Sequence, residues 1–345
     1  MPVHIISSAC ISHSPTFKHD FWFENAELER WSNTMAATEP DYKTLLPPAS
    51  LRRMSHIVKM GLGAGILALK QAGITTPEGI IYATGIGCIE ETNKFLDVLT
   101  KNNETLLTPT AFIQSTHNTV AGQMALFTNC KGYNNNFVHQ NLSFEYALMD
   151  AIGLLNTGAL NNVLVGSSDE LTGTYIEMMQ RAGYLKSSPT DESGFIAGEG
   201  ATAFILANSN NEEGIKIEGI ECAQAIENHN DLQKMLGELC SLNNIQLHEI
   251  DLILSGACSD QHWDNNLNSF SNATSIPTGQ FKNLCGEFYS ASAFGFWLAV
   301  QLLNGKQVPA PLKLQPNLTN VPKRILIVNH YKGESYSMTL VAKER

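Results

Sequence analysis

The stretch FVHQNLSFEYALMDA, residues 137–151, decides how the chain folds. It predicts a strand that turns directly into a helix, because apolar residues recur at helical spacing from Phe144 onward. Ser143 is placed to cap the first turn. Such a junction lies at the positive end of the helix dipole, where free amides can stabilise an oxyanion, and enzymes use it to hold a nucleophile. The residues at this junction are Gln140 and Asn141, and neither side chain is a nucleophile.

Short apolar runs alternate with helical segments along the rest of the chain. The runs typical of buried strands are residues 4–10, 79–85, 162–166, 200–207, 215–220, 251–255, 324–329 and 335–342. The segments with helical periodicity are residues 56–72, 91–99, 121–126, 231–242 and 290–303. This alternation predicts a layered α/β fold with buried strands. The composition turns polar at residues 208–213, which predicts two similar halves, 1–210 and 211–345.

Composition excludes several classes of function. The 345 residues carry a net charge of −11 at pH 7, and an acidic chain repels phosphate backbones, so we expect no nucleic acid partner. No run of 18 apolar residues occurs, so no membrane span is predicted, and residues 1–6 suggest a first strand rather than a signal peptide. The seven cysteines are scattered singly, without a CxxC motif. They predict reduced thiols in a cytoplasm and no metal site.

Five segments resemble those of β-ketoacyl synthases, in the family's order. GFIAGEGA at residues 194–201 resembles the GFxxGEGA signature, and VLVGSSDE at 163–170 resembles the strand that ends in a Gly-Gly-x-Glu turn. STHNTVAGQ at 115–123 resembles the helix along the dimer interface, and FKNLCGE at 281–287 resembles the K-S-x-x-G-H segment. Asn329 opens the counterpart of the C-terminal N-S-F-G-F-G-G loop. The resemblance implies a dimer with a thiolase-like, five-layered αβαβα fold of two βαβαβαβ halves.

All three catalytic positions of the family differ in this chain. The family condenses an acyl chain with malonyl units on an acyl carrier protein, using an elbow cysteine and two histidines. Counting back from Gly166 by the family's spacing places Asn141 at the nucleophile, and a slip of one residue would place Gln140 there. Ser255 stands in for the first histidine and Glu287 for the second.

Other positions of the resemblance are kept or altered. Lys282 matches the scaffold lysine. The counterpart of the C-terminal loop, from Asn329, has lost most of its glycines, and Gly333 falls where the gating phenylalanine sits. His117 and Asn118 are candidates for the dimer interface.

These replacements predict that the chain does not catalyse condensation by itself. An amide cannot form a thioester, and serine has no pKa near 7 with which to replace imidazole as an acid or base. An ionised glutamate would repel a developing enolate. We therefore expect a pseudo-ketosynthase that lacks the Cys-His-His triad and needs no cofactor.

Ketosynthase-like proteins without the cysteine are chain-length factors, which pair with an intact ketosynthase. The sequence of residues 86–92 and 109–119 most resembles the corresponding segments of chain-length-factor-like proteins from bacterial aryl polyene and flexirubin pigment clusters. We expect a heterodimer in which the partner supplies the cysteine and both histidines and brings the acyl carrier protein. The sequence does not decide whether the chain forms a homodimer when the partner is absent.

Two other functions remain as alternatives. One is a divergent acyltransferase or malonyl-carrier-protein decarboxylase that uses Ser143 or the amides at Asn141. The other is a homodimeric scaffold without a polyketide role. For Cys258 the sequence favours a buried structural thiol, because no basic neighbour marks it as reactive. The turn at residues 85–87 lacks the third glycine of a dinucleotide loop.

Overall fold

The computed structural model describes residues 2–23, 31–105, 107, 109–209, 214–318 and 320–343. Ten strands form one hydrogen-bonded series in the order β10-β9-β11-β12-β8-β1-β7-β5-β3-β4. The strands before residue 210 are β1 (Val3–Ile11), β3 (Gly79–Ala83), β4 (Tyr133–Phe137), β5 (Asn162–Asp169) and β7 (Gly200–Asn208). Those after it are β8 (Ile215–Gln224), β9 (Leu252–Ser255), β10 (Thr278–Gln280), β11 (Arg324–Tyr331) and β12 (Ser335–Lys343).

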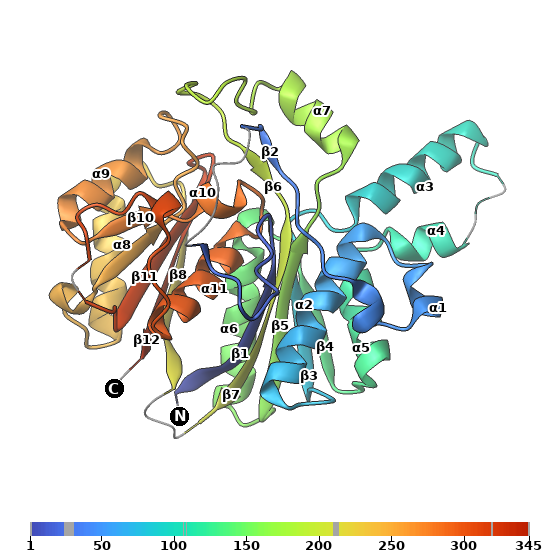
Figure 1. Cartoon of the computed structure of the whole chain (residues 1–345), viewed down its shortest axis with the longest axis horizontal. Helices are drawn as coiled ribbons and strands as arrows, with labels where there is room; N and C mark the ends of the chain where they lie inside the picture. Colours follow the sequence, from blue (N-terminus) through green and yellow to red (C-terminus); the bar gives the residue numbers. More distant parts are fainter. Residues whose placement is uncertain are drawn as a thin grey trace.

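The series consists of two five-stranded groups with the same pattern of pairing. In the order β4-β3-β5-β7-β1, the first two pairs are parallel and the last two antiparallel. The order β10-β9-β11-β12-β8 repeats that pattern. The two groups join through β1 and β8, which pair only at His4 with Lys216 and at Ile5 with Ile215. A separate pair of short strands, β2 (Thr34–Met35) and β6 (Ala197–Gly198), lies above one end of the sheet (Figure 1).

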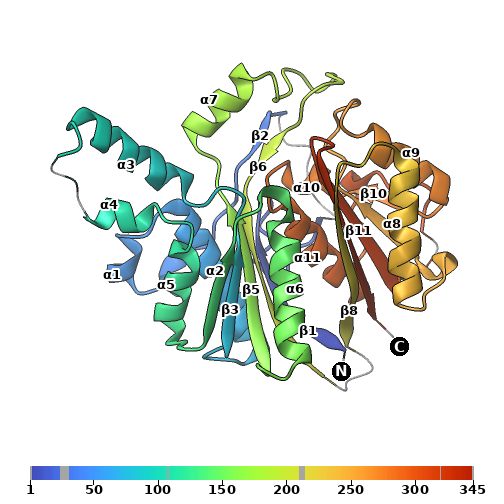
Figure 2. The same cartoon turned by 180° about the vertical axis from the view of Figure 1, so that it is seen from behind.

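Helices cover both outer faces and fill the space between the two groups of strands (Figures 1 and 2). The α-helices among the described residues are α1 (Pro48–Leu51), α2 (His56–Ala72), α3 (Ile89–Lys101), α4 (Pro109–Gln114), α5 (Thr119–Thr128), α6 (Ser143–Asn156), α7 (Gly173–Arg181), α8 (His229–Leu242), α9 (Asn265–Thr274), α10 (Lys282–Cys285) and α11 (Ala291–Leu303), of which α3, α4 and α7 project away from the sheet. Three apolar cores follow from this layering. α2 and α5 pack on the outer face of the first group, and α8 and α9 on the outer face of the second. α6 and α11 form the middle layer, so the order is helix, sheet, helix, sheet, helix.

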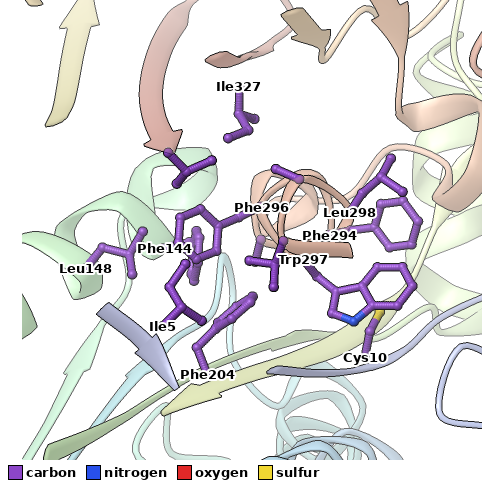
Figure 3. Close-up of a cluster of buried hydrophobic side chains, with 14 of the residues drawn as sticks. Ile5, Cys10, Phe144, Leu148, Phe204, Phe294, Phe296, Trp297, Leu298 and Ile327 are labelled. Carbon is purple, nitrogen blue, oxygen red and sulfur yellow. The ribbon is translucent and has the colours of Figure 1, made fainter. Parts of the chain in front are cut away.

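The middle layer is held by aromatic side chains from distant parts of the sequence (Figure 3). The ring of Phe296 on α11 lies 5.5 Å from Phe144 on α6 and 4.9 Å from Phe204 on β7, measured between centroids. Both contacts are edge-to-face, which is a favourable arrangement of ring quadrupoles. All but one of the residues of α11 are buried, which explains why its sequence is apolar on every side.

The strands and helices of the main layers were largely predicted from periodicity, and most of the elements that were not predicted are short or polar. α2 ends as expected at Gly73, which adopts φ +67°, the left-handed conformation that glycine tolerates. α9 was missed because only Leu267 and Phe270 of its ten residues are buried. The predicted boundary segment, 208–213, lies partly outside the described residues, and the division into 1–210 and 211–345 stays a prediction. No helix among the described residues combines the length and the apolar character that crossing a bilayer needs.

Candidate functional site

The elbow is built as a 3-10 turn, Gln140–Leu142, between β4 and α6. The prediction that the strand turns directly into the helix is therefore wrong, because one 3-10 turn lies between them. Gln140 has φ +52° and an exposed side chain, whereas Asn141 is 2 % exposed. The Ser335 hydroxyl donates to Asn141 Oδ1 at 2.6 Å, and Asn141 Nδ2 donates to the Ser335 carbonyl at 3.3 Å. The buried amide is thus fixed by the start of β12, in the other half of the chain.

Ser143 is not the cap of α6. The helix begins at Ser143 itself, and its buried hydroxyl accepts a hydrogen bond from the His139 amide at 2.7 Å. The same hydroxyl lies 2.9 Å from the Thr84 carbonyl and 2.7 Å from the Gln140 carbonyl, to which it can donate. These bonds tie the turn to the end of β3. They engage the hydroxyl with backbone groups only, which is not the setting of an activated nucleophile.

Glu287 and Lys282 form a buried ion pair. Lys282 Nζ lies 2.8 Å from Glu287 Oε2 and donates to the His330 carbonyl, also at 2.8 Å. Both side chains are 2 % exposed. Burial raises the pKa of Glu287 and is opposed by the adjacent ammonium group. Lys282 thus uses two of its three donors within the protein, and one oxygen of Glu287 is held by the ammonium group.

Ser255 ends β9, next to both β10 and β11. Its hydroxyl accepts a weak bond from the Ala257 amide at 3.3 Å. Asn329 lies inside β11 rather than opening a loop, so that part of the prediction is wrong; the turn occupies only residues 332–334. Asn329 faces Gly256 so closely that a Cβ placed on Gly256 would lie 2.3 Å from Oδ1 of Asn329. Gly256 therefore lets two strand ends approach.

Cys258, Asp264 and His330 form a second buried cluster beside the ion pair, with their potential ligand atoms within 4.8 Å of one another. The Gly333 amide donates to His330 Nδ1 at 3.1 Å, so this nitrogen carries the lone pair and the proton is assigned to Nε2. Nε2 in turn donates to Asp264 Oδ1 at 2.9 Å. A metal ion would need the lone pair of Nε2, so this hydrogen-bonded arrangement does not fit one.

The charges in this cluster follow from its burial. Burial lowers the pKa of His330, which keeps the imidazole neutral. Burial alone would raise the pKa of Asp264, but hydrogen bonds from His330 and from the Cys258 amide hold it below its usual range. Burial also raises the pKa of Cys258, and the negative charges of Glu287 and Asp264 add to that. The thiol is therefore protonated and structural, although Lys282 is the basic neighbour that the sequence did not reveal.

Three tyrosines fill the space above the end of β3. The rings of Tyr289 and Tyr331 lie 4.6 Å apart, and Tyr175 of α7 interacts with both. Burial raises the pKa of Tyr175 and of Tyr331, so both stay protonated. Tyr289 packs so tightly on Gly85 that a Cβ placed on Gly85 would lie 2.1 Å from the Cβ of Tyr289. The glycine turn after β3 is thus explained by an aromatic neighbour rather than by a nucleotide.

Two buried carboxylates lie at the end of β5, and one of them, Asp169, joins the two halves. Asp169 accepts hydrogen bonds from the Thr84 hydroxyl at 2.9 Å and the Gly85 amide at 2.8 Å, both in the first half. It also accepts from the Ser290 amide at 2.7 Å, just before α11. Its neighbour Glu170 accepts from the amides of residues 57 and 90, near the first turns of α2 and α3. The sequence marked this segment by resemblance but not as the junction between halves.

Glu199 of the GFIAGEGA segment holds a second network. It accepts from the amides of Ala37 and Leu171, at 2.9 and 2.8 Å, and lies 3.0 Å from His56 Nε2. His56 Nδ1 lies 3.3 Å from Glu39. Burial alone would lower the pKa of His56, but the hydrogen bonds to the two glutamates outweigh it and raise the pKa to about 10. His56 is therefore protonated at neutral pH, a role that no sequence motif suggested.

His117 and Asn118 lie in the turn between α4 and α5 and are exposed. The ring of His117 covers Gly87, which has φ +72° and could not carry a side chain there. Their place at an interface stays a prediction. The structure does bring the elbow to the later segments, because Ser335 holds Asn141 and Ser337 donates to Glu145 at 2.7 Å.

Comparisons with known proteins identify the fold. The β-ketoacyl synthase N-terminal domain matches residues 22–238, well over half of the chain. No curated protein sequence matches. A β-ketoacyl synthase from Burkholderia phymatum STM815 is similar over 100 % of both chains, with a TM-score of 0.78 and 16 % identity.

Two similar structures are complexes. One is the ketosynthase ApeO with its chain length factor ApeC from Xenorhabdus doucetiae, with a TM-score of 0.74, 14 % identity and coverage of 99 % of this chain and 98 % of that one. The other is AntDE:AntF, a type II acyl carrier protein in complex with its ketosynthase, with a TM-score of 0.79, 14 % identity and 99 % coverage of both. The thiolase-like α/β fold predicted from the sequence is confirmed. On the match to residues 22–238 and on its fold, the chain belongs to the β-ketoacyl synthase family.

Proposed function

We propose that this chain is a non-catalytic, chain-length-factor-like subunit that pairs with an intact ketosynthase. The observation that carries the proposal is the buried pair of Lys282 and Glu287, at the position that the resemblance assigns to the second histidine. A carboxylate locked to a lysine cannot act as a neutral hydrogen-bond donor to an enolate. With an amide at the elbow, Asn141 or Gln140, and the hydroxyl of Ser255, the three positions that the resemblance assigns to catalysis hold neither a thiol nor an imidazole.

The tyrosine cluster supports the same conclusion. The ring of Tyr289 fills the space between Gly85 and Tyr331 at the end of β11. An acyl group could enter that space only if these rings moved. The enzymatic alternative needs Ser143 as a nucleophile. Its hydroxyl is fully buried and bonded to backbone groups, so no observation favours that alternative.

An apolar face beside an open strand edge supports pairing with a partner. β4 ends the strand series and leaves one edge without a strand partner among the described residues. α5 packs on β4 and exposes Leu126 and Phe127, and α4, which precedes it in the chain, exposes Phe112 and Ile113. Exposed apolar patches and free strand edges are typical of interfaces. We assign this face to the ketosynthase partner, with His117 and Asn118 in the turn between the two helices.

The finer assignments rest on the resemblance. We propose a role in aryl polyene or flexirubin biosynthesis, with the acyl carrier protein recruited through the partner. The seven cysteines are free, which supports a reducing, cytoplasmic location.

Two experiments test the proposal. The purified chain is incubated with acyl- and malonyl-loaded carrier protein, and its intact mass is measured; we expect no covalent adduct and no decarboxylation. The chain is then co-expressed with an intact ketosynthase from an aryl polyene gene cluster, and we expect a mixed dimer by size-exclusion chromatography with mass detection. An acyl adduct on the isolated chain would overturn the non-catalytic role, and a failure to form the mixed dimer would overturn the pairing.

A further inference from the structure

A pocket of about 480 Å³ opens on the second edge of β1, and no residue of the elbow lines it. β1 pairs with β7 along its whole length, but with β8 only at His4 and Ile5. A register shift separates Ile5 from Ser7, and Ile6 between them is 45 % exposed. A large apolar side chain is thus left open on a strand from the middle of the series.

Aromatic and apolar side chains from three elements form the walls around Ile6. Phe17 and Trp22 come from the segment after β1, Leu67 from α2, and Trp297 from α11. Trp22 and Trp297 lie 6.3 Å apart between ring centroids. Figure 3 shows Trp297 at the border of the middle core, beside Cys10. Trp22 Nε1 donates to the Gln307 carbonyl at 2.8 Å, which fixes the outer wall.

The charge of this pocket is opposite to that of the chain. Its lining includes Lys18, His19 and Lys306 and no aspartate or glutamate, although the net charge of the chain is −11. Lys306 Nζ lies over the Trp22 ring at 5.6 Å from its centroid. Among the described residues, no carboxylate forms an ion pair with Lys18 or Lys306. Within the described part of the chain, two ammonium groups without a carboxylate partner therefore lie at a pocket that mixes apolar side chains with polar ones, such as those of Thr16, Gln71 and Gln301.

We propose that this pocket binds a small amphipathic anion of the class of medium-chain carboxylates, with its chain on Ile6 and Trp297 and its carboxylate at Lys18 and Lys306. The apolar side chains among the lining residues would alone accept a neutral chain, and the lysines alone would accept any anion. Their combination in one cavity selects a ligand that carries both parts. The volume lies within the usual range for small-molecule sites, about 300–1,000 Å³.

Calorimetric titration of the full chain tests the proposal with three probes. We expect octanoate to bind, butyrate to bind at least about tenfold more weakly because it lacks four methylenes, and octyltrimethylammonium not to bind. Quenching of tryptophan fluorescence by octanoate, reduced in Trp22→Phe, would place the ligand in this pocket.

Charge-reversal variants provide the decisive comparison. The double variant Lys18→Glu, Lys306→Glu is expected to weaken octanoate binding about tenfold. The matched control, Lys43→Glu with Lys131→Glu, reverses two exposed lysines elsewhere and should leave binding unchanged. Thermal melting confirms that both variants are folded. Equal affinities in the two double variants, or an affinity independent of chain length, would overturn the proposal; neither outcome bears on pairing with a ketosynthase, because this pocket lies outside the apolar face of α4 and α5.

Discussion

Glu287 is a buried carboxylate whose neighbour Lys282 is equally buried. Removing two charges from water is costly, and their attraction offsets that cost only while both partners are present. The Lys282 ammonium also holds the His330 carbonyl, so the pair connects α10 to β11. A change at either residue therefore leaves a charge without a partner in the core of the second half.

We expect Glu287→Gln to lower the free energy of unfolding by about 3 kcal/mol, because Lys282 would be left uncompensated. The double variant Glu287→Leu, Lys282→Met should recover most of that loss, since it removes both charges. Urea denaturation followed by circular dichroism measures both values. Glu177→Gln is the control: it breaks an exposed pair with Arg181 and should cost less than about 1 kcal/mol. Similar losses for Glu177→Gln and Glu287→Gln would contradict this account.

His56 makes the stability of the fold depend on pH. Its pKa is raised from 6.5 to about 10 by Glu199 and Glu39, so the folded chain binds a proton that the unfolded chain releases above pH 6.5. This contribution is fully present below pH 6.5 and is lost as the pH rises towards 10. We expect the free energy of unfolding to fall over that window in the native chain and to fall less steeply in His56→Gln.

Denaturation curves at several pH values between 6 and 10 test this expectation. His248→Gln, which changes an exposed histidine, is the control and should keep the native slope. If His56→Gln retained the same slope as the control, the proton on His56 would not be linked to folding.

The short strand β6 explains why the GFIAGEGA segment needs its glycine at residue 198. The Gly198 amide donates to the Glu287 carbonyl at 2.8 Å, and the Glu287 amide donates to the Ile196 carbonyl at 2.7 Å. A Cβ on Gly198 would lie 2.0 Å from the Cys285 carbonyl oxygen, which belongs to the backbone and cannot move freely. The GFIAGEGA segment thus holds the segment that carries Glu287 through two backbone hydrogen bonds, which we call the backbone clasp.

We expect Gly198→Ala to destabilise the fold by about 1–3 kcal/mol, since the backbone of α10 must shift to make room. Gly237→Ala is the matched substitution in α8, where a Cβ meets nothing within 4 Å. It should stabilise the chain by roughly 0.5–1 kcal/mol, because alanine favours a helix interior. Melting temperatures that move in the same direction for both variants would contradict the clasp.

The sequence predicted the elements whose periodicity is set by burial. The apolar runs in α2, β5, β7 and β11 predicted these elements, because most of their residues are buried. The turn at Gln140 did not follow, because a left-handed glutamine depends on the contacts of its neighbours. The partners of Asp264 and His330 did not follow either, because they are separated by 66 residues and meet only through the fold. The resemblance singles out Lys282, but its pairing with Glu287 depends on how α10 folds back towards β11.

At the scale of the whole molecule, the open edge of β4 and the apolar face of α4 and α5 carry the proposed pairing. Phe112 and Ile113 are 57 and 60 % exposed, which is costly for a chain that remains alone. We expect Phe112→Glu with Ile113→Glu to abolish the mixed dimer with the ketosynthase while the isolated chain stays folded, with only the small loss of stability that comes from the contact of Phe112 with Phe95.

Size-exclusion chromatography of the co-expressed pair measures this outcome. Leu242→Glu is the control, because Leu242 is 72 % exposed at the end of α8, in the other half. A mixed dimer that survives the double substitution, or that is lost equally in the control, would show that the partner binds elsewhere.

The placement of α11 also sets an order of events during synthesis. The inner faces of β7 and α6 are covered by Phe296 and its neighbours, yet α11 begins at Ala291, long after β7 has ended at Asn208. At about 5–20 residues per second, a nascent chain would display Phe144 and Phe204 for several seconds before their cover emerges. We expect chains arrested before residue 291 to be cut rapidly by protease in β7 and α6 and to recruit chaperones, whereas chains arrested well beyond residue 303 are protected.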